Sequence, residues 1–180
     1  MKNKLITSVL AVFAFAFLMA SCSGGATYSI DNPTDQAITV SIDGKDPVSI
    51  GAKEFKKMDG TLSNGEHTMK IGDGQEIKFT LDKDHVMLNP TRSTYIKVLQ
   101  EYGVGMQSSD NDTIINLDGQ SYEGPFPLVS SEPFIYTGDL NFQVDSPFKD
   151  EITSSKTGTV VMKKLFRKDE FLKFYKDEFE

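Results

Sequence analysis

The chain has 180 residues and a formal net charge of −7 at pH 7, with 26 acidic side chains against 19 Lys and Arg. This acidic balance argues against nucleic-acid binding, which requires clustered basic side chains. A single cysteine excludes a disulfide framework within the chain, so the fold must depend on its hydrophobic core.

The first 22 residues have the layout of a secretory signal. Lys2 and Lys4 precede an uncharged, largely apolar stretch at 5–20, which is shorter than the roughly 20 residues of a membrane span, and small residues lead to Cys22. The segment Leu-Met-Ala-Ser-Cys at 18–22 resembles the lipobox of bacterial lipoproteins. The resemblance implies a signal peptide over 1–21 and lipidation of Cys22. An uncleaved anchor and an ordinary cleaved signal are the alternatives.

The same resemblance implies a location in the bacterial cell envelope. Diacylglycerol and an N-acyl chain such as palmitate on Cys22 would anchor the protein in a membrane without spanning it. Ser23 stands where lipoproteins retained in the inner membrane often carry Asp, which favours the outer membrane. Because no acidic run follows Cys22, we expect the protein to face the periplasm.

After a short tether at 22–26, short strands alternate with turns. We expect a mainly β fold, an antiparallel β-sandwich of Ig-like or Greek-key type with a C-terminal α-helix. The sandwich domain is predicted at 27–104, a linker at 105–112, and a second β-rich segment at 113–180 that packs on the first or forms its own domain. No convincing internal repeat is found. Strands are expected at 28–30, 37–42, 48–50, 67–71, 77–81, 95–99, 113–117, 126–129, 140–144 and 157–165.

Part of the predicted sandwich carries a family resemblance. Ile-Asp-Gly-Lys at 42–45, Leu62, and Gly-Glu-His-Thr-Met-Lys-Ile at 65–71 are similar to the pattern of PEGA and carboxypeptidase-regulatory-like domains. The Pro-Glu-Gly-Ala signature itself is absent. The resemblance implies a small sandwich that acts as a non-catalytic module of envelope or extracellular proteins.

The C-terminal stretch changes to a helical period. Asp169 is a candidate cap, and Phe171, Leu172, Tyr175 and Phe179 form one apolar stripe. The stripe either docks on an open face of the sandwich or binds a partner.

The sequence offers little for catalysis, since it contains no nucleophile elbow, phosphate-binding loop or H-E-x-x-H pair. Carboxylates such as Asp110, Asp112 and Asp118 are the remaining candidates for an active site, and their spacing is typical of loops. We therefore expect a protein that is not an enzyme.

Two His-x-Met pairs give the sharpest metal hypothesis. His67 and Met69, and likewise His85 and Met87, share one face of a strand, and imidazole with thioether is a ligand set suited to copper. Against this, Met69 shares its face with Ile71 and is expected in the core, while His85 follows a probable turn. A periplasmic copper carrier is the alternative function.

Three further short patterns point to modification or metal binding. Asp110-Asn111-Asp112 and Asp82-Lys83-Asp84 gather oxygen ligands that suit calcium, without the spacing of a calcium-binding loop. Asp-Thr-Ile at 112–114 resembles an O-glycosylation site of some Bacteroidetes, with Thr113 as the acceptor.

Together these observations predict a lipid-anchored, non-catalytic binding or scaffold protein. Its partners would be the membrane, through Cys22, and an envelope protein or glycan. No cofactor is expected beyond the copper and calcium hypotheses.

Overall fold

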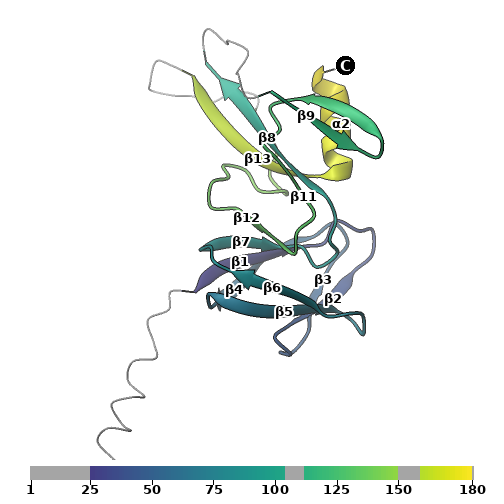
Figure 1. Ribbon diagram of the computed structural model, residues 1–180, viewed down its shortest axis with the longest axis vertical. Helices are drawn as coiled ribbons and strands as arrows, with labels where there is room; N and C mark the ends of the chain where they lie inside the picture. The colour runs from purple at the N-terminus through teal and green to yellow at the C-terminus, as the bar shows by residue number, and fades with distance from the viewer. Residues whose placement is uncertain (1–24, 104–111, 150–158, 180) are drawn as a thin grey trace, which may run out of the picture.

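The computed structural model describes residues 25–103, 112–149 and 159–179 (Figure 1). The predicted signal peptide and Cys22 lie outside these ranges. A lower sheet has the order β3 (Val48–Ile50), β2 (Ile38–Ile42), β5 (Gly65–Ile71) and β6 (Ile77–Leu81). A central sheet has the order β12 (Phe134–Tyr136), β7 (His85–Leu88), β1 (Ala26–Asp31) and β4 (Phe55–Leu62).

An upper sheet has the order β11 (Leu128–Ser130), β8 (Tyr95–Tyr102) and β13 (Val160–Arg167). Beyond it lie the hairpin of β9 (Thr113–Leu117) and β10 (Gln120–Gly124) and the helix α2 (Lys168–Phe179), as Figure 1 shows. This mainly β architecture with a C-terminal helix confirms the expected fold class.

The layers are held together by three hydrophobic clusters, and the central sheet carries core residues on both faces. Along β7, Val86 and Leu88 pack in the cluster between the lower and central sheets. Met87, which points the other way, packs with Tyr95 and Leu165 of the upper sheet. One pairing departs from the antiparallel expectation, because β1 and β7 run parallel.

The C-terminal helix docks on the upper sheet, so the core interpretation of its aromatic stripe is confirmed. Phe171 is fully buried and meets Phe126 edge-to-face, with ring centroids 5.0 Å apart. The helix begins at Lys168, which puts Asp169 in its first turn rather than at the cap. No helix among the described residues is long and apolar enough to cross a membrane.

Several strands differ from the sequence prediction. β4 was not expected, because it is an edge strand with two lysines and a single buried side chain, so its sequence shows no clear alternation. His85 begins β7, directly after the predicted turn. Residues 140–144 form no strand and contribute only an isolated bridge between Phe142 and Lys164.

Strand pairing also crosses the predicted linker at 105–112. β8 precedes it and pairs with β11 and β13, both of which follow it. β12, from the predicted second segment, pairs with β7 in the central sheet. The segments predicted at 27–104 and 113–180 therefore share two sheets.

The strand pairing reveals an internal repeat, which was not expected from the sequence. In the first unit, β1 pairs with β4, and β2 pairs with β3 and β5, all antiparallel. In the second unit, β7 pairs with β12, and β8 pairs with β11 and β13, again antiparallel. The hairpin β9–β10 is inserted between β8 and β11. The parallel pair β1–β7 joins the two units edge to edge.

A sequence signal marks the repeat, since Asn-Pro-Thr follows both β1 and β7, with Asn at positions 32 and 89. Each Asn is fully buried. Its side-chain amide donates to the carbonyl four residues later, and its oxygen accepts from the Thr hydroxyl two residues later. The backbone N–H of Asn32 donates to Glu54 at 2.9 Å, and that of Asn89 donates to Pro133 at 2.8 Å. Both acceptors directly precede the Phe that begins β4 or β12.

We predict that Asn32→Ala and Asn89→Ala each lower the free energy of unfolding by at least about 2 kcal/mol. Each change leaves several buried backbone groups without a partner, at about 1–3 kcal/mol per group. Urea unfolding measures the effect, and Asn116→Ala, on the exposed side of β9, is the matched control. A loss in only one of the two variants would contradict the equivalence of the turns.

Candidate functional site

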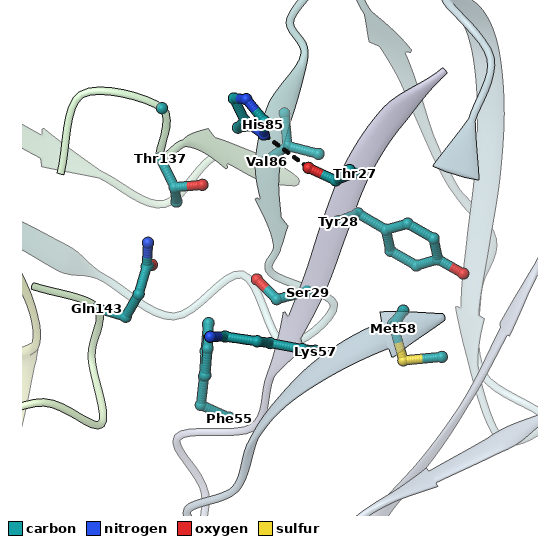
Figure 2. Close-up of a pocket in the computed structure, with 11 residues that line it drawn as sticks. Thr27, Tyr28, Ser29, Phe55, Lys57, Met58, His85, Val86, Thr137 and Gln143 are labelled. Atoms are coloured by element: carbon teal, nitrogen blue, oxygen red, sulfur yellow. Dashed lines mark hydrogen bonds between the residues drawn. The ribbon is translucent and has the colours of Figure 1, made fainter. Parts of the chain in front are cut away.

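An open cleft of about 390 Å³ lies on the face of the central sheet opposite the lower sheet (Figure 2). Ser29 of β1, Lys57 of β4 and His85 of β7 face it from the sheet. The opposite wall comes from the segment after β12, with Thr137 and Gln143. The cleft therefore lies where the first unit meets the second.

Alternation along β1 explains why polar side chains reach the cleft. Tyr28 and Ile30 pack against the core between the lower and central sheets, so Thr27 and Ser29 point to the opposite face. Figure 2 shows Tyr28 on the far side of the strand from Ser29.

The cleft is positively charged and rich in hydrogen-bond groups. Lys57 is exposed and has no ion pair among the described residues, and the described lining includes no Asp or Glu. The Nδ1 atom of His85 lies 2.6 Å from the hydroxyl of Thr27, which fixes the ring at the rim. The Oε1 atom of Gln143 is buried without a hydrogen-bond partner within the described structure. Such a surface suits binding of a polar anion.

The wall of the cleft is held by a buried lysine. The ammonium of Lys164 donates to the carbonyls of Gln143, Val144 and Ser146 at 3.1, 3.3 and 2.5 Å. It also lies 4.6 Å from the ring centre of Phe166. Burial lowers the pKa of this ammonium to about 8. Lys164 thereby fixes the backbone of the segment that carries Gln143.

The wall has a second anchor at Asp139. Its carboxylate accepts from Lys97 at 2.9 Å and from Lys163 at 3.1 Å, one from β8 and one from β13. Burial opposes the charge of Asp139, but these two ammonium groups outweigh it and lower the pKa of the carboxyl. Both strands of the upper sheet therefore hold the wall.

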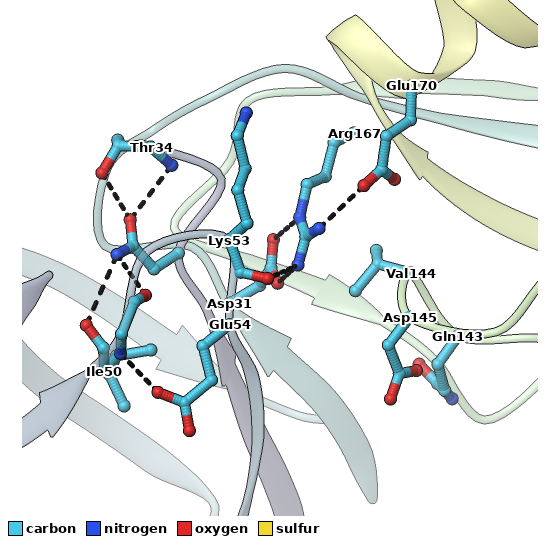
Figure 3. A network of polar contacts seen from close by, with 12 residues as sticks. Asp31, Thr34, Ile50, Lys53, Glu54, Gln143, Val144, Asp145, Arg167 and Glu170 are labelled. Carbon is cyan, nitrogen blue, oxygen red and sulfur yellow. Dashed lines mark hydrogen bonds and ion pairs between the residues drawn. The ribbon is translucent and has the colours of Figure 1, made fainter. Parts of the chain in front are cut away.

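A buried ion pair closes the interface beyond the cleft (Figure 3). Asp31, fully buried at the end of β1, accepts from Arg167 at 2.6 and 2.9 Å and from the hydroxyl of Tyr95 at 2.6 Å. Arg167 also donates to the carbonyl of Lys53 and to Glu170. Burial works against the guanidinium charge, but Asp31 outweighs it and raises the pKa of Arg167. The pair joins the first strand of the chain to the last.

In the first predicted copper pair, His67 and Met69, the imidazole is already engaged by protein oxygen atoms. His67 Nδ1 lies 2.8 Å from the carboxylate of Asp43, and Nε2 lies 2.7 Å from the carbonyl of Ser63. Both ring nitrogens therefore already have an oxygen partner within hydrogen-bond distance, so the ring does not offer a free nitrogen to a metal. Met69 is buried in the core below the central sheet.

The second pair lies elsewhere. His85 is at the rim of the cleft, and Met87 packs in the cluster above the central sheet. The structure therefore does not bring the four copper candidates together at one site. Within residues 25–103, 112–149 and 159–179, no group of three or more His, Cys, Asp or Glu side chains is placed to hold a metal ion.

The other predicted residues lie apart from the cleft. Asp82 and Asp84 are exposed, and Asp110 and Asn111 lie outside the described residues. Asp118 forms an exposed ion pair with Lys168. The hydroxyl of Thr113 donates to the carbonyl of Phe126 at 2.9 Å and would have to leave this bond to be glycosylated.

Of the residues that line the cleft, only His85 was proposed as a site residue from the sequence. Lys57 was missed because β4 was not expected, and Gln143 because residues 140–144 were assigned to a strand. Ser29 carried a usable signal, since it alternates with Tyr28 and Ile30 in a strand that was expected.

We predict that Asp31→Asn and Arg167→Met each lower the free energy of unfolding by about 3–5 kcal/mol, because each leaves a buried charge without its partner. The double variant should lose clearly less than the sum of the two. Lys168→Met, which breaks an exposed pair, is the control and should cost less than about 1 kcal/mol. Additive losses in urea unfolding would contradict the coupling.

We predict a pH signature from Lys164. Its pKa is about 8 in the folded state and near 10.5 in an unfolded chain, so the unfolded state binds more protons between these values. The stability of the wild type relative to Lys164→Met should therefore rise from pH 8 to pH 10.5, by up to about 3 kcal/mol. Urea unfolding at several pH values measures it, with Lys173→Met on the exposed side of α2 as control. A constant difference would count against the buried ammonium.

Comparison with known proteins finds no matching family model, no matching curated protein and no matching solved structure. The similarity of residues 42–71 to PEGA-type domains stays a prediction. The cleft and the N-terminal sequence are therefore the features that bear on function.

Proposed function

We propose that the protein is a lipid-anchored, non-catalytic binding protein of the bacterial cell envelope, with the cleft beside β1 as its ligand site. The proposal rests on the open cleft and on Lys57, which has no ion pair within the part of the chain that the structure describes. Its volume falls within the range of about 300–1,000 Å³ that is typical of small-ligand sites.

The N-terminal sequence supports the anchor and the compartment. Lys2 and Lys4, the apolar stretch and Cys22 fit a lipoprotein signal, and Ser23 favours the outer membrane with the protein facing the periplasm. The ligand would then be another envelope component, either a protein or a glycan.

We infer binding rather than catalysis from the spacing of the titratable groups in the cleft. Lys57 and His85 lie on β4 and β7, with β1 between them in the central sheet. Neighbouring strands are about 4.8 Å apart, so the backbones of these residues are separated by about 10 Å. Acid–base partners need contact with one reacting group within hydrogen-bond reach, which this arrangement does not favour.

We predict that His85→Trp, which places an indole at the rim of the cleft, abolishes co-purification of the ligand component from detergent-solubilised envelopes. Lys83→Trp, in the turn before β7, is the matched control and should retain it. Circular dichroism verifies that both variants fold. Unchanged co-purification with His85→Trp would overturn the cleft as the binding site.

The anchor is tested in the same cells. Cys22→Ala should lose metabolic labelling with a palmitate analogue and leave the membrane fraction. A wild-type protein that takes up no label would overturn the lipid anchor and leave the binding proposal standing.

A further inference from the structure

We propose that the cleft binds an acidic saccharide, with Lys57 holding the carboxylate of a uronic-acid unit. This inference rests on the proposed function and adds the chemical class of the ligand to it.

The charge of the cleft lining favours an anionic ligand. The chain carries a net charge of −7, yet the described cleft lining includes no Asp or Glu and contains the ammonium of Lys57. The nearby cations Lys97, Lys163 and Arg167 are all paired with Asp139, Asp31 or Glu170. Lys57 is exposed and has no such partner among the described residues. An ammonium left free in an acidic protein favours an anionic ligand, and a carboxylate would form a charge-assisted hydrogen bond with it.

The remaining polar groups favour a ligand with several hydroxyls. No hydrogen bond within the described structure engages the hydroxyl of Ser29 or of Thr137, and both face the cleft in Figure 2. A hydroxyl both donates and accepts, which matches the hydroxyls of a sugar. The amide of Gln143, with its unpartnered Oε1, adds a group that gains a partner if it turns toward a ligand.

The shape and the position of the cleft also fit a saccharide. The volume of about 390 Å³ is near the lower end of the small-ligand range and suits one or two sugar rings. Phe55 contributes an apolar edge to the lining. Because the cleft is open, it can hold a uronic-acid unit at the end of a longer glycan as well as the free sugar.

The test is calorimetric titration of the folded chain with galacturonate, trigalacturonate and neutral galactose. We expect galacturonate to bind at least tenfold more tightly than galactose, and Lys57→Met to remove this preference. The preference should also weaken with rising salt concentration. Tighter binding of trigalacturonate than of galacturonate identifies a polymer as the source, and equal affinity identifies the free acid.

The control variant is Lys56→Met, on the same strand. The Lys56 ammonium donates to the carbonyl of Ser49 in the lower sheet, so its side chain lies on the other face. The Lys56→Met variant removes the same charge as Lys57→Met and should leave saccharide binding unchanged. Equal effects of Lys56→Met and Lys57→Met would overturn the role of Lys57.

The outcomes separate this inference from the proposed function. Equal affinity for galactose and galacturonate, both lost in His85→Trp, would overturn the carboxylate but support the cleft. No saccharide binding, with an envelope component still lost in His85→Trp, would overturn the saccharide alone. If no saccharide binds and His85→Trp changes nothing, both proposals fail.

Discussion

The buried pair of Asp31 and Arg167 is the constraint on which the arrangement of the two units depends. The residues are 136 positions apart in the chain, and both side chains are almost fully buried. A charge at such depth is tolerated only when its partner and hydrogen bonds are in place, so neither unit can move away without leaving one charge uncompensated. Tyr95 and the carbonyl of Lys53 complete the network from β8 and from the turn before β4. The pair thus specifies one way of packing the upper sheet on the central sheet.

The cleft follows from the same geometry. Thr27, Ser29 and Asp31 lie on one face of β1, two residues apart. At the Asp31 end, the upper sheet and Arg167 cover this face completely. At the Thr27 end, the segment after β12 covers it only in part, and the cleft remains open. Lys164 of β13 binds carbonyls of that segment, and the segment's own Asp139 is held by Lys97 and Lys163 of the upper sheet, so the opening belongs to the folded structure rather than to a loose loop.

The sequence was informative wherever the signal was local. Alternation in residues 38–42 and 77–81 predicted two strands, and the helical spacing of Phe171 and Tyr175 predicted the helix, while docking was one of two interpretations of its apolar stripe. β4 was not predicted because an edge strand has few buried positions. The repeat was not predicted because the sequences of the two units share a three-residue motif and little else. The His-x-Met spacing correctly placed His67 and Met69 on one face. It could not show that Asp43 and Ser63, which come from two different turns, occupy both nitrogens of the ring.

The proposed anchor and the proposed site constrain each other. Cys22 precedes Thr27 by only five residues, and an extended chain covers at most about 3.6 Å per residue. A lipid on Cys22 would therefore hold the start of β1, and with it the open end of the cleft, within about 18 Å of the membrane surface. A glycan attached to the membrane or lying on it could therefore reach the cleft without the protein leaving its anchor. The same short distance leaves the cleft open to a small ligand that diffuses freely. A binding site beside the first strand thus suits a protein tethered by its N-terminus.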